Sequence, residues 1–350
     1  MPIIVRPDGP IPARIMIVGE APGADEERVG TPFVGASGQE LNRMLHEVGI
    51  SRSECFMTNV ARERPLGNDI SQFIATKKKD ITPEHIQLRG KYVRRQIIDG
   101  IKMLEAEIAA VRPNIIIAVG NTSMWALTDK WGIIKWRGSM LKATIPGLDY
   151  QPKVIPTYHP AAILRMWAWR AIAVRDLRRA AAESRTREYQ ISKWNFIVRP
   201  SFEVAMSTIE MLIDKCNLDS SWIDFDLETR AGHITCAGLS WSLTDAICIP
   251  FVTKDNKEGY WSIEEESAII HSLYKLLTHK NIKVRGQNLL YDSQYTYRHW
   301  HFVPRVIQDT MISHHVAFAG LRKSLDFQAS MYCEYYVQWK PEKGDWKEGG

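Results

Sequence analysis

The sequence predicts an α/β protein of two domains, in which buried strands alternate with helices. Three short apolar runs, residues 14–19, 113–120 and 154–157, have the composition of buried parallel strands. Helical stretches such as 91–111 lie between them, and this alternation is typical of a layered α/β domain. The length of 350 residues also fits two domains, since a domain has about 150 residues.

The pattern of the chain restarts after a long, basic helical stretch over residues 165–187. A strand-like run follows, then an expected helix over 202–215 and an alternating, hairpin-like region over 234–252. We therefore expect a first domain over residues 1–188 and a second over 189–350. The second is again α/β, with antiparallel strands at its start.

The composition permits a nucleic-acid partner and argues against a membrane protein. The net charge of +5 is compatible with a polyanionic partner. No apolar stretch reaches the ~18 residues of a membrane span, and the N-terminus lacks the layout of a secretory signal. Five cysteines are scattered without a CxxC motif, which indicates reduced thiols in an intracellular, cytoplasmic protein.

A glycine- and proline-rich segment, residues 19–38, follows the first predicted strand directly. Such residues fix a tight loop whose backbone amides can approach a ligand. The alternative is a phosphate-binding turn of a nucleotide fold. The spacing of its glycines matches neither GxGxxG nor a P-loop, so a dinucleotide site is disfavoured.

Three segments resemble the active-site motifs of family 4 uracil-DNA glycosylases, and they occur in that family's order. They are GEAPGADEERVGTPFVG at 19–35, TNV at 58–60 and PTYHPA at 156–161. The similarity covers residues 12–180. It implies a three-layer α/β/α fold and an enzyme that flips uracil out of DNA and hydrolyses its N-glycosidic bond.

By this resemblance, three side chains would hold the extruded base. Phe33 is the ring on which uracil stacks, and the Asn59 amide reads the O4 and N3–H edge, which cytosine presents in the opposite pattern. His159 bonds O2 and stabilises charge on the departing uracilate, an effect of about 3–4 kcal/mol for a preorganised donor. The plain alternatives are a core aromatic, a turn asparagine and a structural histidine.

The group that activates water is less directly indicated by the sequence. Other glycosylase families place an aspartate two residues after the first glycine, and Ala21 stands there. Among the nearby carboxylates Glu20, Asp25 and Glu26, the resemblance favours Glu20 at the pocket wall and Glu26 near uracil C5, where it excludes thymine. Gly19 and Ala21 would complete the substrate-binding lining.

Family 4 members hold a [4Fe–4S] cluster through four cysteines, and this chain departs from that pattern. The N-terminal pair is missing, and Glu63 and Gly100 stand at the other two positions. Because Cys55 alone cannot hold a cluster, we expect no iron–sulfur centre. A basic insert, residues 66–95, takes the place of the cluster segment and is either a solvated loop or a phosphate contact.

A second chemical pattern lies in the run WIDFDLET at residues 222–229. Strand alternation places Asp224, Asp226 and Glu228 on one face, where they would repel one another unless a cation neutralises them. Magnesium or manganese ions that activate water need such ligands. A solvent-exposed acidic face is the alternative.

This run resembles the first motif of the DEDD 3′–5′ exonuclease domain of family A DNA polymerases, a ribonuclease H-like fold, and GQNLLYD resembles the second. The resemblance implies Mg²⁺ (or Mn²⁺) held by Asp226, Glu228 and Asp292. It also implies contacts of Asn288 and Thr229 with the DNA end. Asp309, in a further matching run, is expected to be a scaffold or capping residue.

The last motif of that family, Tyr-x-x-x-Asp, does not occur after Tyr336. The sequence therefore predicts the N-terminal fragment of a longer bacteriophage-type DNA polymerase, with an impaired exonuclease, acting in the host bacterial cytoplasm. The expected partners are DNA and a polymerase domain beyond residue 350. A different function is also consistent with the sequence, namely a glycosylase-like domain that senses uracil or a modified base, or grips DNA, without cleaving it.

Overall fold

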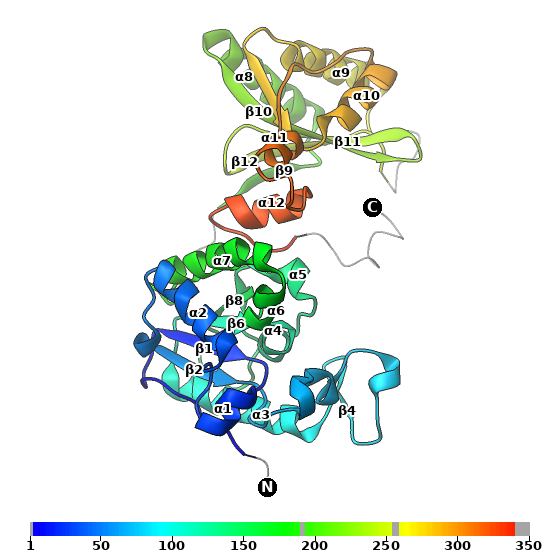
Figure 1. Ribbon diagram of the computed structural model, residues 1–350. Coiled ribbons are helices and arrows are strands. Elements are labelled where there is room, and N and C mark those ends of the chain that lie inside the picture. Colours follow the sequence, from blue (N-terminus) through cyan, green and yellow to red (C-terminus); the bar gives the residue numbers. More distant parts are fainter. Residues whose placement is uncertain (1–2, 190–192, 254–258, 340–350) are drawn as a thin grey trace. The chain divides into compact units, whose positions relative to one another are not determined.

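The computed structural model describes residues 3–189, 193–253 and 259–339 and divides into two compact units (Figure 1). The first unit comprises 3–189 together with Ala329–Trp339, and the second ends at residue 328. The sequence had placed everything after residue 188 in the second domain. The difference arises because the segment Ala329–Trp339 packs with the first unit, through contacts between residues far apart in the chain.

A five-stranded sheet forms the centre of the first unit, in the order β2-β1-β6-β8-β7. Four strands are parallel and β7 is an antiparallel edge strand. The three predicted apolar runs are confirmed as β1, β6 and β8, and every residue of these strands is buried. The bounds are β1 Ile15–Gly19, β2 Cys55–Asn59, β6 Ile115–Val119, β7 Leu141–Lys142 and β8 Lys153–Thr157.

Helices cover both faces of this sheet, which confirms the predicted α/β/α layering. Met16 and Val18 of β1 belong to the core beneath α3 and α4, and strand alternation turns Ile15 and Ile17 to the opposite face, on the side of α7. Helix α2 packs beside α7. The bounds are α1 Ala24–Val29, α2 Ala36–Glu47, α3 Arg95–Val111, α4 Asn121–Thr128, α5 Ile133–Trp136, α6 Pro160–Arg165 and α7 Arg170–Glu183.

The basic insert folds differently from the expected loop and helix. Lys91–Val93 forms strand β5, which pairs with β3 (Ile74–Ala75) and β4 (Ile86–Leu88) in a small antiparallel sheet. Helix α3 begins only at Arg95. Pairing with β3 and β4 holds residues 91–93 extended, so the prediction of a helix from residue 91 was wrong at its start.

The helix expected over 165–187 is interrupted. Helix α6 ends at Arg165, a single 3₁₀ turn spans Trp167–Trp169, and α7 begins at Arg170. The Trp169 ring stacks on Tyr158 with ring centroids 4.5 Å apart, which holds this turn beside the end of β8. Further 3₁₀ turns are Arg52–Glu54, Leu66–Asn68, Ile70–Gln72 and Lys78–Asp80.

The second unit is built on a six-stranded sheet in the order β14-β13-β10-β11-β12-β9. An antiparallel meander, β10 to β12, is followed by β13 parallel to β10 and β14 parallel to β13. This arrangement is the predicted ribonuclease H-like fold. The bounds are β9 Asn195–Val198, β10 Ser221–Arg230, β11 His233–Ser240, β12 Asp245–Pro250, β13 Ile282–Gly286 and β14 Val306–Asp309.

One face of β10 contributes to the core of the second unit. Ile223, Phe225 and Leu227 are buried among residues of α8 and α9, whereas the alternate side chains point to the other face. The helices are α8 Phe202–Leu218, α9 Ile263–Leu277, α10 Leu289–Trp300, α11 Thr310–Ala317 and, last in the chain, α12 Leu325–Tyr332. No helix in the described part of the chain is long and apolar enough to cross a membrane.

Candidate active site

A cavity of about 490 Å³ opens at the carboxyl ends of the parallel strands of the first unit. This edge is where open α/β sheets generally bind ligands. The structure brings the three motif segments together there. The lining includes six of the predicted site residues, namely Glu20, Ala21, Glu26, Phe33, Asn59 and His159, with Tyr158 and Trp169 beside them. Gly19, which was also predicted to line the pocket, is not among the lining residues.

Gly19 lies where the aromatic ring and the amide meet. A Cβ at this position would be 2.2 Å from Asn59 Oδ1 and 2.7 Å from Phe33 Cζ, so only glycine leaves room for both. Phe33 itself has a φ of 56°, an unusual conformation for a bulky residue. Arg52 supports it by donating hydrogen bonds to the Phe33 carbonyl at 3.1 Å and the Pro32 carbonyl at 2.8 Å. Arg52 lies outside all three motifs, so the sequence did not indicate it.

His159 is oriented by its own turn. The Ala161 backbone N–H donates to Nδ1 at 3.2 Å, which leaves the proton of the neutral ring on Nε2. Burial lowers the pKa of His159 below its usual value, an effect that Glu20 and Glu26 oppose. The site therefore holds a neutral imidazole whose Nε2–H is the available donor.

Glu20 is fixed against the start of helix α4. Its Oε1 accepts a hydrogen bond from the Thr122 backbone N–H at 2.8 Å, and a Cβ on Gly120 would be 2.7 Å from the same oxygen. The positive end of a helix favours a carboxylate at this place. The carboxylate is thus held at the cavity wall with a defined orientation.

Glu26 joins the two ends of the first motif through hydrogen bonds. Its side chain is buried, and its oxygens accept hydrogen bonds from the backbone N–H groups of Gly23 at 2.8 Å and Gly35 at 3.5 Å. It therefore anchors both ends of the loop that carries Phe33, and it also lines the cavity. This anchoring was not expected from the sequence.

In the second unit, the carboxylates predicted to bind a metal ion are less closely grouped than the side chains around the cavity of the first unit. Asp226 and Glu228 are exposed on β10, while Asp292 is buried at the start of α10 and accepts the Leu227 backbone N–H at 2.7 Å. Burial raises the pKa of Asp292, and Glu228 adds to the effect. Oxygen donors of this kind suit Mg²⁺. Among the described residues, however, no three His, Cys, Asp or Glu side chains are grouped so that they could hold a metal ion.

The charge of Asp224 is neutralised in a different way from the one that the sequence predicted. Asp224 lies on the same face of β10, as predicted, but its carboxylate is paired with Arg285 of β13 through two hydrogen bonds of 2.5 and 2.8 Å. The repulsion expected along the strand is therefore relieved at this position by a guanidinium rather than by a metal ion. The parallel pairing that sets Asp224 opposite Arg285 could not be read from the sequence.

The two residues predicted to contact the DNA end, Thr229 and Asn288, lie at the end of β10 and at the start of α10. Asn288 is exposed at the start of α10, and its backbone N–H donates to Asp309 at 3.0 Å. Thr229 forms a 2.5 Å hydrogen bond with the Tyr291 hydroxyl. Asp309 also accepts the Met311 backbone N–H at 2.8 Å and caps α11, which confirms it as a scaffold residue.

The cavity therefore combines an aromatic ring, an amide and a neutral imidazole at the carboxyl edge of a parallel sheet, which is the set of groups expected of a uracil pocket. The chain belongs to the uracil-DNA glycosylase superfamily, whose family model matches residues 6–179. It is 35% identical over 177 residues to the type-4 uracil-DNA glycosylase of Pyrobaculum aerophilum, covering 49% of this chain and 78% of that protein. The Thermotoga maritima type-4 enzyme is 33% identical over 181 residues, covering 51% of this chain and 81% of that protein.

Other similarities are more distant. A DNA polymerase of Bacillus phage SP01 is 28% identical over 166 residues, which are 47% of this chain and 15% of the phage protein. Among solved structures, Escherichia coli RNase D has a TM-score of 0.28 and 18% identity, covering 43% of this chain and 35% of RNase D. Brucella melitensis NrnC with bound Mg²⁺ has a TM-score of 0.29 and 14% identity, covering 43% of this chain and 66% of NrnC.

The residues of the first unit do not fit the iron–sulfur cluster of family 4 enzymes. Of the cysteines, only Cys55 and Cys333 lie in the described part of this unit. Cys55 is buried in β2, and burial raises the pKa of its thiol to about 12, which opposes metal binding. At Gly100, a Cβ would be 1.8 Å from the Val60 carbonyl oxygen, so a cysteine has no room there.

Proposed function

We propose that the first unit excises uracil from DNA by hydrolysing the N-glycosidic bond. The observation that carries this proposal is the convergence of Phe33, Asn59 and His159 on one cavity. An extruded uracil stacks on the Phe33 ring, and the Asn59 amide accepts N3–H and donates to O4. Cytosine offers an acceptor at N3 and a donor at C4, so it leaves both bonds unmade.

The reaction breaks the bond between C1′ and N1, and its electron pair remains on the departing uracil. Negative charge then develops at O2, where the His159 Nε2–H donates. A preorganised donor of this kind lowers the barrier by about 3–4 kcal/mol. Glu20 holds the water that attacks C1′ and takes its proton, while Glu26 lies beside C5, where a thymine methyl group would be excluded.

The rim of the cavity supports a DNA-binding role. Leu164, Met166 and Trp167 are 45%, 51% and 58% exposed, and Arg165 of the same turn lines the cavity. Large apolar side chains at such a position can enter the base stack that the flipped nucleotide leaves. Arg165 is placed to contact a neighbouring phosphate.

The test is release of free uracil from single- and double-stranded oligonucleotides that contain one deoxyuridine. Asn59→Ala and His159→Ala are expected to lose release by about 100- to 1,000-fold. His46→Ala, an exposed histidine on α2, is the matched control and should behave as wild type. Equal rates in wild type and in both pocket variants would contradict the proposal.

The alternative is a sensor that binds uracil in the template without cleaving it. The observation in its favour is Ala21, which lines the cavity where other glycosylase families place an aspartate. A sensor would bind deoxyuridine-containing DNA more tightly than thymidine DNA and would leave no abasic sites. The release assay separates this function from the first.

For the second unit, we propose a metal-dependent 3′–5′ exonuclease attached, in the parent protein, to a DNA polymerase acting in a bacterial cytoplasm. The support for the nuclease is the acidic face of β10 next to the buried Asp292. The support for the polymerase link is the partial similarity of the chain to a phage DNA polymerase. Asp226, Glu228 and Asp292 would supply the oxygen ligands for Mg²⁺ or Mn²⁺, and Thr229 and Asn288 would contact the strand end. Because these carboxylates are loosely gathered, we expect weak activity that Asp292→Asn abolishes.

A further inference from the structure

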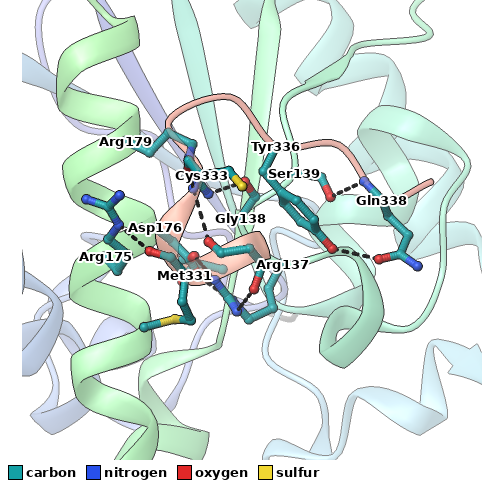
Figure 2. A network of polar contacts seen from close by, with 12 residues as sticks. Arg137, Gly138, Ser139, Arg175, Asp176, Arg179, Met331, Cys333, Tyr336 and Gln338 are labelled. Carbon is teal, nitrogen blue, oxygen red and sulfur yellow. Dashed lines mark hydrogen bonds and ion pairs between the residues drawn. The ribbon is translucent and has the colours of Figure 1, made fainter. Parts of the chain in front are cut away.

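The segment Ala329–Trp339, called the strap below, is a part of the first unit that no glycosylase motif includes. It comes after the second unit in the sequence, yet it packs against helix α7 and the loop that follows α5. Figure 2 shows the strap beside Arg175 and Arg179 of α7 and beside Gly138 and Ser139 of that loop. The strap contributes no residue to the cavity lining.

Arg179 makes the densest set of contacts with the strap. Its buried guanidinium donates to three strap carbonyls, those of Ser330 at 3.0 Å, Cys333 at 2.7 Å and Glu334 at 3.2 Å. The same group donates to the Gly138 carbonyl at 2.6 Å. A planar fork with five N–H donors can make such a set of bonds, whereas a lysine ammonium cannot.

Further bonds attach the strap on both sides. Arg175 of α7 donates to the Met331 carbonyl at 2.8 Å. On the loop side, the Met140 backbone N–H donates to the Tyr336 carbonyl at 2.8 Å, and the Gln338 backbone N–H donates to Ser139 Oγ at 3.1 Å. The strap thus bridges helix and loop.

A continuous set of buried bonds leads from the strap to the catalytic turn. Arg137 Nη1 donates to Ser330 Oγ at 2.8 Å, and its Nε donates to Asp176 Oδ2 at 2.9 Å. The same Asp176 oxygen accepts the Thr157 hydroxyl at 3.0 Å. Thr157 precedes His159 by two residues. In parallel, the Gly138 N–H donates to the Pro156 carbonyl at 2.8 Å.

A purely structural ion pair is the simpler interpretation of Arg137 and Asp176, which are both fully buried. Two observations indicate that the pair also positions the turn that carries His159. Asp176 uses one oxygen for the hydroxyl of the residue that ends β8, and the loop residue held by Arg179 bonds the carbonyl of Pro156 in the same strand end. Both branches therefore reach the two residues that lead into the Tyr158–His159 turn.

We propose that the strap completes the glycosylase unit, and that Arg137 and Asp176 are positioning residues that set His159 through Thr157. The inference rests on the proposed uracil excision. Its consequence is that excision depends on a segment that follows the exonuclease-like unit in the chain. A His159 that is misplaced by even 1 Å would lose much of its effect on the transition state, since such errors cost up to about 100-fold.

The test uses the full chain and compares Arg179→Lys with Arg178→Lys. Arg178 is exposed on the same helix and is the matched control. We expect Arg179→Lys to speed amide exchange across the strap and to lower kcat for uracil release about tenfold, with KM nearly unchanged. The control should match wild type. Rapid exchange at the strap with an unchanged kcat would overturn the proposal.

A second pair of variants keeps the inference testable if Arg179→Lys does not fold. Thr157→Val removes the hydroxyl that Asp176 accepts, and Thr157→Ser restores it, so activity should fall and then recover. The His159 ring resonance, followed by NMR with labelled histidine, should move in Thr157→Val and return in Thr157→Ser. An unmoved resonance contradicts positioning, whereas a wild type that releases no uracil contradicts only the proposed function.

Discussion

The cavity of the first unit and the acidic face of the second differ in how their polar groups are held. Around the cavity, backbone N–H groups fix Glu20, Glu26 and His159. On the second unit, Asp226 and Glu228 extend from an exposed strand face, and only Asp292 of the predicted ligands is buried. A site for a neutral base can be preorganised by the protein alone, whereas a row of carboxylates depends on a cation for its final geometry.

Removal of divalent cations should give the largest difference between the activities of the two units. With EDTA in excess, the proposed nuclease activity of the second unit should be lost, because Asp226, Glu228 and Asp292 would act through the ion that activates water. Uracil release should be unchanged, because Phe33, Asn59 and His159 need no metal. Both activities can be measured on one end-labelled oligonucleotide that contains deoxyuridine. Loss of uracil release in EDTA would contradict this division.

A methyl group placed between the Asn59 amide and the Phe33 ring should have the next largest effect. Gly19→Ala places a Cβ between Asn59 Oδ1 and Phe33 Cζ, which must displace the amide or the ring. We expect uracil release to fall by about 100-fold. Gly320→Ala, where nothing lies within 4 Å of the new Cβ, is the control. A Gly19→Ala enzyme with wild-type kinetics would show that the two side chains do not act together.

The pH dependence should report the neutral state of His159. Because burial lowers its pKa from the usual 6.5, the ring stays neutral until the pH falls below that value. Single-turnover rates should therefore be flat above pH 6.5 and decline only below it, as protonation of Nδ1 breaks the bond from Ala161.

The same shift affects stability, with a defined sign. The unfolded chain takes up a proton on His159 near pH 6.5, while the folded chain takes it up only at lower pH. Stability therefore falls as the pH decreases through this window and is unaffected above it. A rate that falls as the pH rises would indicate that the cationic ring is the active form, whereas a fall on acidification with its midpoint at or above pH 6.5 would contradict the lowered pKa of His159.

The smallest expected effect concerns Asp224 and Arg285. Both side chains of this pair are about 40% exposed, so Arg285→Met should lower the free energy of unfolding by only about 0.2–1 kcal/mol. Urea unfolding of the full chain, with Lys283→Met as the control on the same strand, measures it. A much larger loss would mean that the carboxylates of β10 do repel one another strongly.

The sequence predicted the parts of the molecule that depend on local pattern. Buried strands such as Ile115–Val119 are continuous apolar runs, and each of the three glycosylase motifs is an unbroken segment of sequence. Both can therefore be recognised without a structure. The alternation of β10 likewise placed its carboxylates on one face. Local periodicity and motif order carry this information.

The contacts that the sequence did not predict join residues far apart in the chain. Arg52 supports the Phe33 turn, Arg285 neutralises Asp224, and the strap packs on α7. Each depends on the register of strands or on a packing that only the folded chain creates. Short strands such as Lys91–Val93 were missed for a related reason, because pairing with β3 and β4 outweighs the local helical pattern.

The most direct test of the account is the identity of the product that the full chain makes from DNA with a single deoxyuridine. Mass spectrometry should find free uracil and an abasic strand in equal amounts from the wild-type protein, and neither from the variant that carries Asn59→Ala together with His159→Ala. Tight binding of the deoxyuridine strand by the wild-type protein, with the strand recovered intact, would contradict the account and leave the cavity a sensor of the base.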